Sequence, residues 1–206
     1  MSKSIAKTLR SEPPKKVRII GGVWRSRLLS VIDLPGLRPS TDRIRETLFN
    51  WLGQDLSGLN CLDIFAGTGV LGFEAVSRKA QRVVLIEHDK KASANLRTNF
   101  QLLQSSPVPG TVEILQQDGL EFLKRQPDRS WQLIFLDPPF QEFSLFDQAF
   151  IQAGRVCDDS AGGGIYIEFP AERKLAEIEA LLPDWYCGKY LEAGKVKACL
   201  FRLRRD

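Results

Sequence analysis

Short, uninterrupted apolar runs alternate along the chain with segments in which apolar residues recur every three or four positions. The runs predict strands buried on both faces, and the segments between them predict helices that cover a sheet. Strands are expected at 61–65, 83–86, 112–115, 133–136 and 164–168, and helices at 42–52, from the 66–72 segment to 79, and at 92–103, 120–124, 145–156 and 171–182. This alternation predicts an α/β fold with a Rossmann-like, doubly wound and mostly parallel sheet.

The two ends of the chain depart from this alternation. Residues 185–191 and 196–203 predict two strands joined around Gly194, which would place an antiparallel strand at the edge of the sheet. Residues 17–29 contain β-branched residues around a Gly-Gly pair and predict a small N-terminal β-hairpin. The expected parts are a disordered basic lead-in at 1–16, a hairpin extension at 17–37 and a main domain at 38–206.

The apolar run Leu133–Leu136 ends in an unusual way, because Asp137 is followed by Pro138, Pro139 and Phe140. Proline donates no backbone hydrogen bond and favours an extended residue before it, so the strand must stop at Asp137. Ligands of open α/β sheets bind at this carboxyl end. A carboxylate, backbone carbonyls left free as acceptors and an aromatic ring suit a flat ligand with an amino group, such as a nucleobase.

Charge is unevenly distributed along the 206 residues, whose formal net charge is +4. Residues 1–45 contain 11 Lys and Arg but only three Asp and Glu, a charge of +8 against −4 for the remainder. A basic arm on an acidic body indicates a polyanionic partner such as nucleic acid. Within the arm, Arg18, Arg25 and Arg27 with neighbouring Trp24 are the predicted RNA-binding residues; packing of Trp24 on the domain is compatible with this.

Several classes of protein are disfavoured by composition. Hydrophobic residues make up 43% of the chain, yet no apolar run is long enough to span a membrane, and no secretory signal is recognised. The cysteines lie far apart without C-x-x-C spacing, at positions 61, 157, 187 and 199. This spacing argues against a metal site and a disulfide framework, so we expect reduced thiols and a cytoplasmic location.

A second motif lies between the first predicted strand and helix of the main domain. Gly67-Thr68-Gly69-Val-Leu-Gly72 has the G-x-G-x-x-G pattern, and Glu87 follows 20 residues after Gly67 at the next strand end. Glycines allow a ligand close to the backbone, and an acid at that distance binds ribose hydroxyls. The motif therefore predicts a nucleoside cofactor.

Two features favour S-adenosylmethionine over NAD as that cofactor. Asp63, within the strand before the glycines, would repel a pyrophosphate but suits the cationic methionine end. Glu87, Asp118 and Asp137 then end three successive strands, as expected for a nucleoside beside an amino substrate. A helix N-cap is the alternative role for Asp118. His88 is assigned no catalytic role, although its backbone is expected to line the cofactor.

These motifs resemble class I methyltransferases over roughly residues 38–170, and Asp137–Phe140 resembles the signature of enzymes that alkylate exocyclic amino nitrogens. The resemblance implies that Asp137, Pro138 and Phe140 are catalytic. It implies a cofactor site made of Arg38, Thr41, Asp63, Ala66, Gly67, Thr68, Gly69, Glu87, His88, Asp118 and Gly119.

Three segments together narrow the resemblance to one family. Arg38–Trp51, Leu62–Gly69 and Asp137–Phe140, with the N-terminal Arg18–Arg27, resemble the bacterial 16S ribosomal RNA (guanine-N2)-methyltransferases that modify guanine 966. This implies methyl transfer from S-adenosylmethionine to 16S RNA or an assembling small subunit, without metal or membrane. By the same resemblance, Arg45 and Glu46 support the methionine pocket.

Three other functions remain open. An adenine-N6 methyltransferase acting on DNA or RNA would use the same Asp-Pro-Pro turn, although 206 residues leave little room for a separate DNA-recognition region. A nicotinamide oxidoreductase fits Gly67–Gly72 but not Asp137–Phe140. A non-catalytic RNA-binding module would need only the basic arm.

Overall fold

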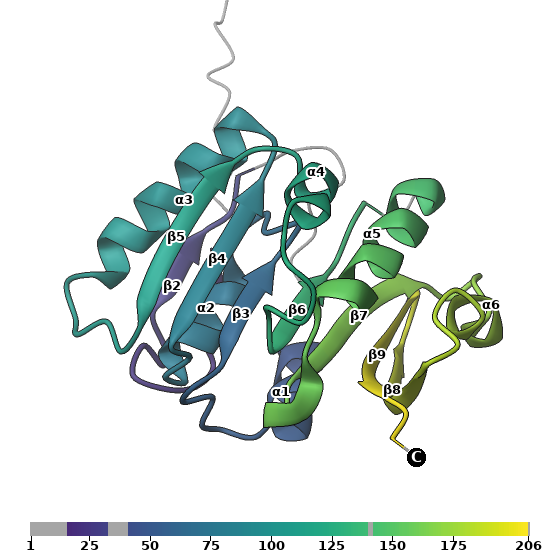
Figure 1. Cartoon of the computed structure of the whole chain (residues 1–206). Helices are drawn as coiled ribbons and strands as arrows, with labels where there is room; N and C mark the ends of the chain where they lie inside the picture. The colour runs from purple at the N-terminus through teal and green to yellow at the C-terminus, as the bar shows by residue number, and fades with distance from the viewer. Residues whose placement is uncertain (1–15, 33–40, 140–141, 206) are drawn as a thin grey trace, which may run out of the picture.

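The computed structural model describes residues 16–32, 41–139 and 142–205, and a seven-stranded sheet forms its centre (Figure 1). The strand order is β5-β4-β3-β6-β7-β9-β8, in which β9 runs antiparallel to its neighbours β7 and β8 and the other neighbouring strands are parallel. The strands of this sheet are β3 (Asn60–Asp63), β4 (Arg82–Glu87), β5 (Thr111–Gln116), β6 (Leu133–Leu136), β7 (Gly164–Pro170), β8 (Trp185–Ala193) and β9 (Val196–Leu203). The predicted α/β fold, with its mostly parallel, doubly wound sheet and antiparallel edge, is confirmed.

Successive strand residues point to opposite sides of the sheet, so the apolar strands present an apolar surface on both faces. Helices cover both of these faces. One hydrophobic core contains Cys61 and residues of the first three helices, and the other contains Leu62 and residues of the later helices. The helices are α1 (Asp42–Leu52), α2 (Val70–Ser77), α3 (Lys90–Leu103), α4 (Gly119–Lys124), α5 (Phe143–Val156), the 3-10 helix η1 (Asp159–Ala161) and α6 (Leu175–Glu179). The result is a three-layered molecule.

The bounds of α1, β6 and β9 match their predictions, whereas α6 is much shorter than the predicted helix 171–182. The side-chain ammonium of Lys197, in β9, explains the difference. It donates to the carbonyls of Ala171 and Arg173, so these oxygens are bound outside any helix. The chain therefore makes a turn before α6 begins.

The predicted N-terminal hairpin is present as β1 (Lys16–Arg18) and β2 (Leu28–Ser30), which pair antiparallel. It packs on α2 rather than projecting from the domain. The backbone N–H of Val23 donates to the carbonyl of Ser77, and a Cβ at Gly22 would lie 1.9 Å from that oxygen. Only glycine fits there, so the hairpin and α2 share one core.

Two cysteines correct the prediction of four reduced thiols. Cys187 in β8 and Cys199 in β9 form a disulfide, with their Cα atoms 6.0 Å apart. They are 12 residues apart in sequence, and the antiparallel pairing of the two strands brings them together. Cys61 and Cys157 are free and buried, and burial raises the pKa of both thiols.

No helix among the described residues is long and apolar enough to cross a membrane. Residues 16–32, 41–139 and 142–205 also contain no group of three or more His, Cys, Asp and Glu side chains that could hold a metal ion.

Candidate active site

The site lies where the order of the parallel strands reverses. From β3 the chain continues to the neighbouring β4 on one side, whereas β6 lies beside β3 on the other. Open α/β sheets bind ligands in the crevice at such a switch point, beyond the carboxyl ends of the strands. Acidic residues collect there, because Asp63, Glu87 and Asp137 lie at the ends of β3, β4 and β6.

The glycine motif forms a tight turn between β3 and α2. The N–H of Gly69 donates to the carbonyl of Ala66, and the N–H of Ala66 donates to Ile86 in β4. Gly67 and Gly69 have φ values of 52° and 79°, a left-handed conformation that favours glycine. Thr68, between them, is buried. The turn therefore exposes backbone rather than side chains to a ligand.

Glu87 connects this turn to the end of β4. Its carboxylate accepts the N–H of Gly67 at 2.9 Å through Oε2 and the N–H of Asp89 at 2.8 Å through Oε1. The side chain is 11% exposed, so it remains reachable at the crevice. His88 beside it is largely exposed, with Nδ1 3.6 Å from Glu87 Oε1. Contact of Glu87 with ribose and of His88 with the cofactor remain predictions.

Asp63 is buried beneath the start of α2. Its Oδ2 accepts the N–H of Gly72 at 3.1 Å, which satisfies one of the free donors in the first turn of the helix. The pKa of Asp63 is raised to about 7, mainly by burial and also by the charge of Glu87, against the lowering effect of the Gly72 bond. Asp63 therefore holds α2 against β3, and its predicted contact with methionine remains a prediction.

Asp118 is the N-cap of α4, as the alternative interpretation expected. Its carboxylate accepts the N–H of Glu121 at 2.8 Å. Gly119 packs so closely against β3 that a Cβ there would lie 2.6 Å from the carbonyl oxygen of Ile64. This close packing brings the 118–119 turn beside the end of β3. Contact of Asp118 and Gly119 with adenine remains a prediction.

The turn after β6 is the other side of the crevice. Asp137 is half-buried and Pro138 is buried. The carbonyl of Pro139 accepts the N–H of Glu142 at 3.1 Å, which corrects the prediction that it stays free. Within the described part of the chain, the carbonyl of Pro138 accepts no hydrogen bond. Phe140 lies outside the described residues.

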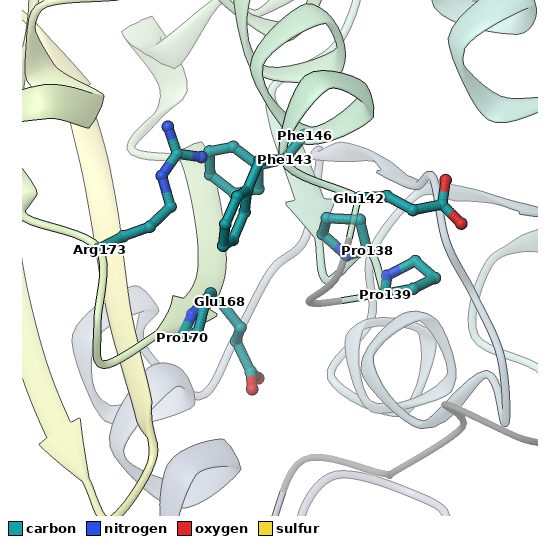
Figure 2. A pocket seen from close by; sticks show the side chains of 8 residues that line it. All are labelled: Pro138, Pro139, Glu142, Phe143, Phe146, Glu168, Pro170 and Arg173. Atoms are coloured by element: carbon teal, nitrogen blue, oxygen red, sulfur yellow. The ribbon is translucent and has the colours of Figure 1, made fainter.

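A pocket opens beside this turn (Figure 2), and most of its lining residues were missed by the sequence predictions. Glu168 of β7 and Arg173 line one side, and Phe143 and Phe146 of α5 line another. Arg173 stacks over both rings, 5.3 and 4.9 Å from their centres, and pairs with Asp147 at 2.7 Å. Glu168 could have been found by the pattern that identified Glu87 and Asp137, because it is an acidic residue at the end of a predicted strand, 164–168.

The α1 region holds the remaining predicted cofactor residues. Thr41 is exposed and caps α1 by accepting the N–H of Ile44, whereas Arg38 lies outside the described residues. Arg45 is fully buried and pairs with Asp42 at 2.9 Å. Its Nε is 3.8 Å from Glu74 of α2, so Arg45 ties α1 to α2.

The predicted RNA-binding residues divide into two kinds. Arg18, Arg25 and Arg27 are exposed, although Arg18 pairs with Asp42 at 2.9 Å. Trp24 has no exposed surface and packs edge-to-face on Phe73 with ring centres 6.5 Å apart. The prediction that Trp24 contacts RNA is therefore wrong for this fold, because its ring completes the core between the hairpin and α2.

Comparison with known proteins agrees with this architecture. The model of the family described as "Conserved hypothetical protein 95" matches residues 17–196. Proteins named ribosomal RNA small subunit methyltransferase D are 42% identical in Haemophilus influenzae, over 91% of this chain and 94% of the relative, and 38% identical in Escherichia coli, over 91% and 90%. A solved Escherichia coli structure is 35% identical and superimposes with a TM-score of 0.75, covering 93% of this chain and all of that one.

The match runs from the hairpin into β9, so it includes the glycine turn, Glu87 and the turn after β6. The relatives are covered almost completely, and the family expected from the sequence motifs is confirmed. This chain belongs to the Conserved hypothetical protein 95 family and is a relative of the proteins named ribosomal RNA small subunit methyltransferase D.

Proposed function

We propose that this protein transfers a methyl group from S-adenosylmethionine to the exocyclic N2 of guanine 966 in 16S ribosomal RNA. The observation that carries the proposal is the turn Asp137-Pro138 at the end of β6, beside a pocket and next to the glycine turn. The names of the relatives support ribosomal RNA of the small subunit as the substrate, and such RNA implies action in the cytoplasm.

The residues at the switch point fit S-adenosylmethionine. Gly67 and Gly69 provide backbone that a ligand can approach. Glu87 follows Gly67 by 20 residues, the sequence spacing expected of an acid that binds ribose hydroxyls. Asp118 and Gly119 would flank the adenine, and Thr41 would stand near the methionine end. When bound, the cofactor supplies a methyl group already activated by its sulfonium, so the protein needs only to align the acceptor and stabilise charge.

The base side of the site performs that alignment. The lone pair of guanine N2 is delocalised into the ring, which makes the amino group a poor nucleophile. In the proposed complex, the two N–H groups donate to the Asp137 carboxylate and the Pro138 carbonyl, so the lone pair turns towards the methyl group. Fixed acceptors of this kind act where charge develops in the transition state. Phe140 is proposed to stack on the base, which leaves its RNA strand at low cost from an unpaired loop.

The RNA backbone is proposed to contact the exposed arginines of the hairpin. Arg18, Arg25 and Arg27 lie on one short hairpin, and arginine binds phosphates in both protein–RNA and protein–DNA complexes. The hairpin packs on the C-terminal end of α2, where the N–H of Val23 donates to the carbonyl of Ser77.

The other candidate functions have less support. An adenine-N6 methyltransferase shares the Asp-Pro-Pro turn, but the relatives are named for ribosomal RNA. A nicotinamide oxidoreductase leaves the pocket beside Asp137 without a role. A non-catalytic RNA-binding module explains the hairpin arginines but neither the glycine turn nor the pocket.

The test is methyl transfer from tritium-labelled S-adenosylmethionine, first to naked 16S RNA and then to assembling small subunits. We expect label in one of these substrates and N2-methylguanine at position 966 by mass mapping. RNA from cells that lack the protein should lose that modification. Label in adenine would support the adenine-N6 alternative, and absence of transfer to either substrate would contradict the proposal.

A further inference from the structure

Four charged side chains around α1 are buried in the protein interior. They belong to Arg45, Glu74, Arg78 and Glu168, and none of these residues is more than 3% exposed. Charged groups are seldom buried unless they are paired with groups of opposite charge. The two positive and two negative charges of this buried cluster balance each other, and the proposed methyl transfer uses none of them directly.

Arg45 has partners on three elements. Its Nη2 donates to the carbonyl of Arg18 in β1 at 2.7 Å and to Asp42 Oδ1 at 2.9 Å. Its Nε lies 3.8 Å from Glu74 Oε1 in α2, and the same Glu74 oxygen accepts the N–H of Ile20 at 2.5 Å. Arg45 is therefore fixed to the hairpin, to the start of α1 and to α2.

The alternation of side chains along β7 directs Glu168 towards the face of the sheet on which α1 packs. Tyr166 belongs to the hydrophobic core that includes Phe49 of α1, whereas Ile165 and Ile167 belong to the other core. Residues two apart in a strand point to the same face, so Glu168 shares the face of Tyr166. Figure 2 agrees, because the Glu168 carboxylate points away from the labelled side chains of α5.

Glu168 connects Arg45 with the turn after β6. Burial lowers the pKa of the Arg45 guanidinium, whereas the carboxylates around it, Glu168 among them, raise it, so Glu168 lies near this charge. Glu168 Oε1 accepts the phenol O–H of Tyr166 at 2.8 Å. The pKa of that phenol is raised well above its ordinary value, mainly by burial and also by the charges of Glu168 and Asp137. Asp137 therefore lies near the phenol that holds Glu168.

A line of aromatic rings runs beside this polar connection. The fully buried ring of Tyr166 packs edge-to-face on Phe135 of β6, with the ring centres 6.3 Å apart. The ring of Phe135 also packs on Phe49 of α1, with the ring centres 6.4 Å apart. Phe135 lies two residues before Asp137, so both the charged groups and the rings extend from α1 to the end of β6.

We propose that Arg45 is a positioning residue for methyl transfer, which holds the turn after β6 through Glu168 and Tyr166. This inference rests on the proposed methyl transfer at that turn. A planar guanidinium binds several acceptors in fixed directions at once, whereas an ammonium is a point charge on a flexible stem. Because the reacting groups must be aligned closely, a small displacement of Asp137 slows the transfer even though Arg45 does not touch the base.

The test compares Arg45→Lys with Arg78→Lys. Both variants keep a buried positive charge but lose the planar guanidinium. Arg78 pairs with Glu74 and lies over the ring of Phe49, 4.1 Å from its centre, so it occupies the α2 side of the same cluster and is the matched control. The measurements are the single-turnover rate at saturating RNA and S-adenosylmethionine, the affinity for S-adenosylhomocysteine, and thermal unfolding.

Both variants should be less stable than wild type, but only Arg45→Lys should lower the single-turnover rate, roughly tenfold or more, with cofactor affinity unchanged. Equal rates in the two variants, at a temperature where both are folded, would overturn the inference. Weaker S-adenosylhomocysteine binding with a wild-type rate at saturation would also overturn it, because Arg45 would then support the methionine pocket. Failure of wild type to methylate guanine would instead overturn the proposed function.

A second variant keeps the inference testable if Arg45→Lys does not fold. Tyr166→Phe removes the hydroxyl that donates to Glu168 and leaves every charge in place. Its single-turnover rate should fall several-fold, with cofactor affinity unchanged. In the double variant, the loss should be smaller than the product of the two single losses, because both residues act through Glu168. A wild-type rate in Tyr166→Phe, or losses that multiply in the double variant, would overturn the inference.

Discussion

The acidic residues at the carboxyl edge of the sheet form two groups that use their oxygens differently. Asp63, Glu87 and Asp118, on the side of the glycine turn, all accept hydrogen bonds from backbone N–H groups. Asp137 and Glu168 stand on the other side of the switch point: Asp137 directly follows β6, and Glu168 lies in the adjacent strand β7 and lines a pocket. The first group organises the main chain, and the second stands beside the turn at which methyl transfer is proposed.

This difference follows from what each half must bind. The cofactor half depends on backbone conformations, such as those of Gly67 and Gly69, which need fixed support. The base half must distinguish one heterocycle from another, and discrimination of bases requires side chains that match donors with acceptors. An acidic residue at a strand end therefore predicts where a site lies more securely than it predicts whether that residue contacts the ligand or supports the main chain.

The largest expected effect concerns the pH dependence of folding and Asp63. Its pKa is about 7 in the folded state, mainly through burial, against an ordinary value of 3.8. At pH values between 3.8 and about 7, Asp63 keeps its proton in the folded state and releases it in the unfolded state. The contribution is therefore fully present below about pH 4 and is lost as pH rises through about 7, on the order of 4 kcal/mol in total.

Denaturant unfolding of wild type and Asp63→Asn between pH 4 and pH 8 measures this contribution. The free energy of unfolding of wild type should fall with pH relative to that of the variant. Asp128→Asn, which changes an exposed aspartate, should follow wild type. Parallel curves for wild type and Asp63→Asn would show that Asp63 is not the buried proton-binding group described here.

The next largest effect is expected from Asp137→Asn. The shape of the side chain is kept, but an N–H group replaces one acceptor and would face the amino group of the base. A mismatch of this kind in a buried site should lower the rate of methyl transfer roughly a hundredfold or more. Single-turnover methylation of small-subunit RNA measures that rate, and calorimetry should find cofactor affinity nearly unchanged. Wild-type rates in this variant would mean that the turn after β6 is not the catalytic one.

A smaller effect is expected from Glu87→Ala on the cofactor side. Loss of a charged acceptor for ribose should weaken binding of S-adenosylhomocysteine by roughly 1–3 kcal/mol. Because Glu87 also holds the N–H groups of Gly67 and Asp89, thermal stability should fall as well. Calorimetry and thermal unfolding separate the two effects, with exposed Glu142→Ala as the control. Unaltered affinity would assign Glu87 a purely structural role.

Local patterns in the sequence predicted the elements that depend on nearby residues. The strand Leu133–Leu136 ends where Pro138 forces it to, and α1 begins after a capping threonine. Contacts between distant segments could not be predicted in the same way. The burial of Trp24 depends on α2, and the pairing of Cys187 with Cys199 depends on the register of two strands.

Glu168 shows the same limit at the site itself. A carboxylate at the end of a predicted strand was visible in the sequence, but its position close to the turn after β6 depends on β7 lying beside β6. Strand order is a property of the whole sheet, and a single sequence shows which strands exist more readily than which are neighbours. The pocket likewise depends on how Arg173 and α5 pack beside the turn after β6, which the sequence alone does not show.

The smallest expected effect concerns the hairpin, which packs on the cofactor half but is proposed to bind RNA. Deleting it would remove core residues such as Trp24, so neutralising its charges is the cleaner experiment. In Arg25→Gln/Arg27→Gln, RNA affinity should fall about equally for all sequences. The slope of log affinity against log salt should decrease by about 1 for each phosphate that an arginine no longer neutralises. Cofactor binding and the preference for guanine should stay at wild-type values.

Arg125→Gln, an exposed arginine at the end of α4 on the opposite face of the sheet, is the control. If the salt slope changes equally in the hairpin variant and in the control, RNA is attracted by the overall charge of the protein and not by a binding site on the hairpin.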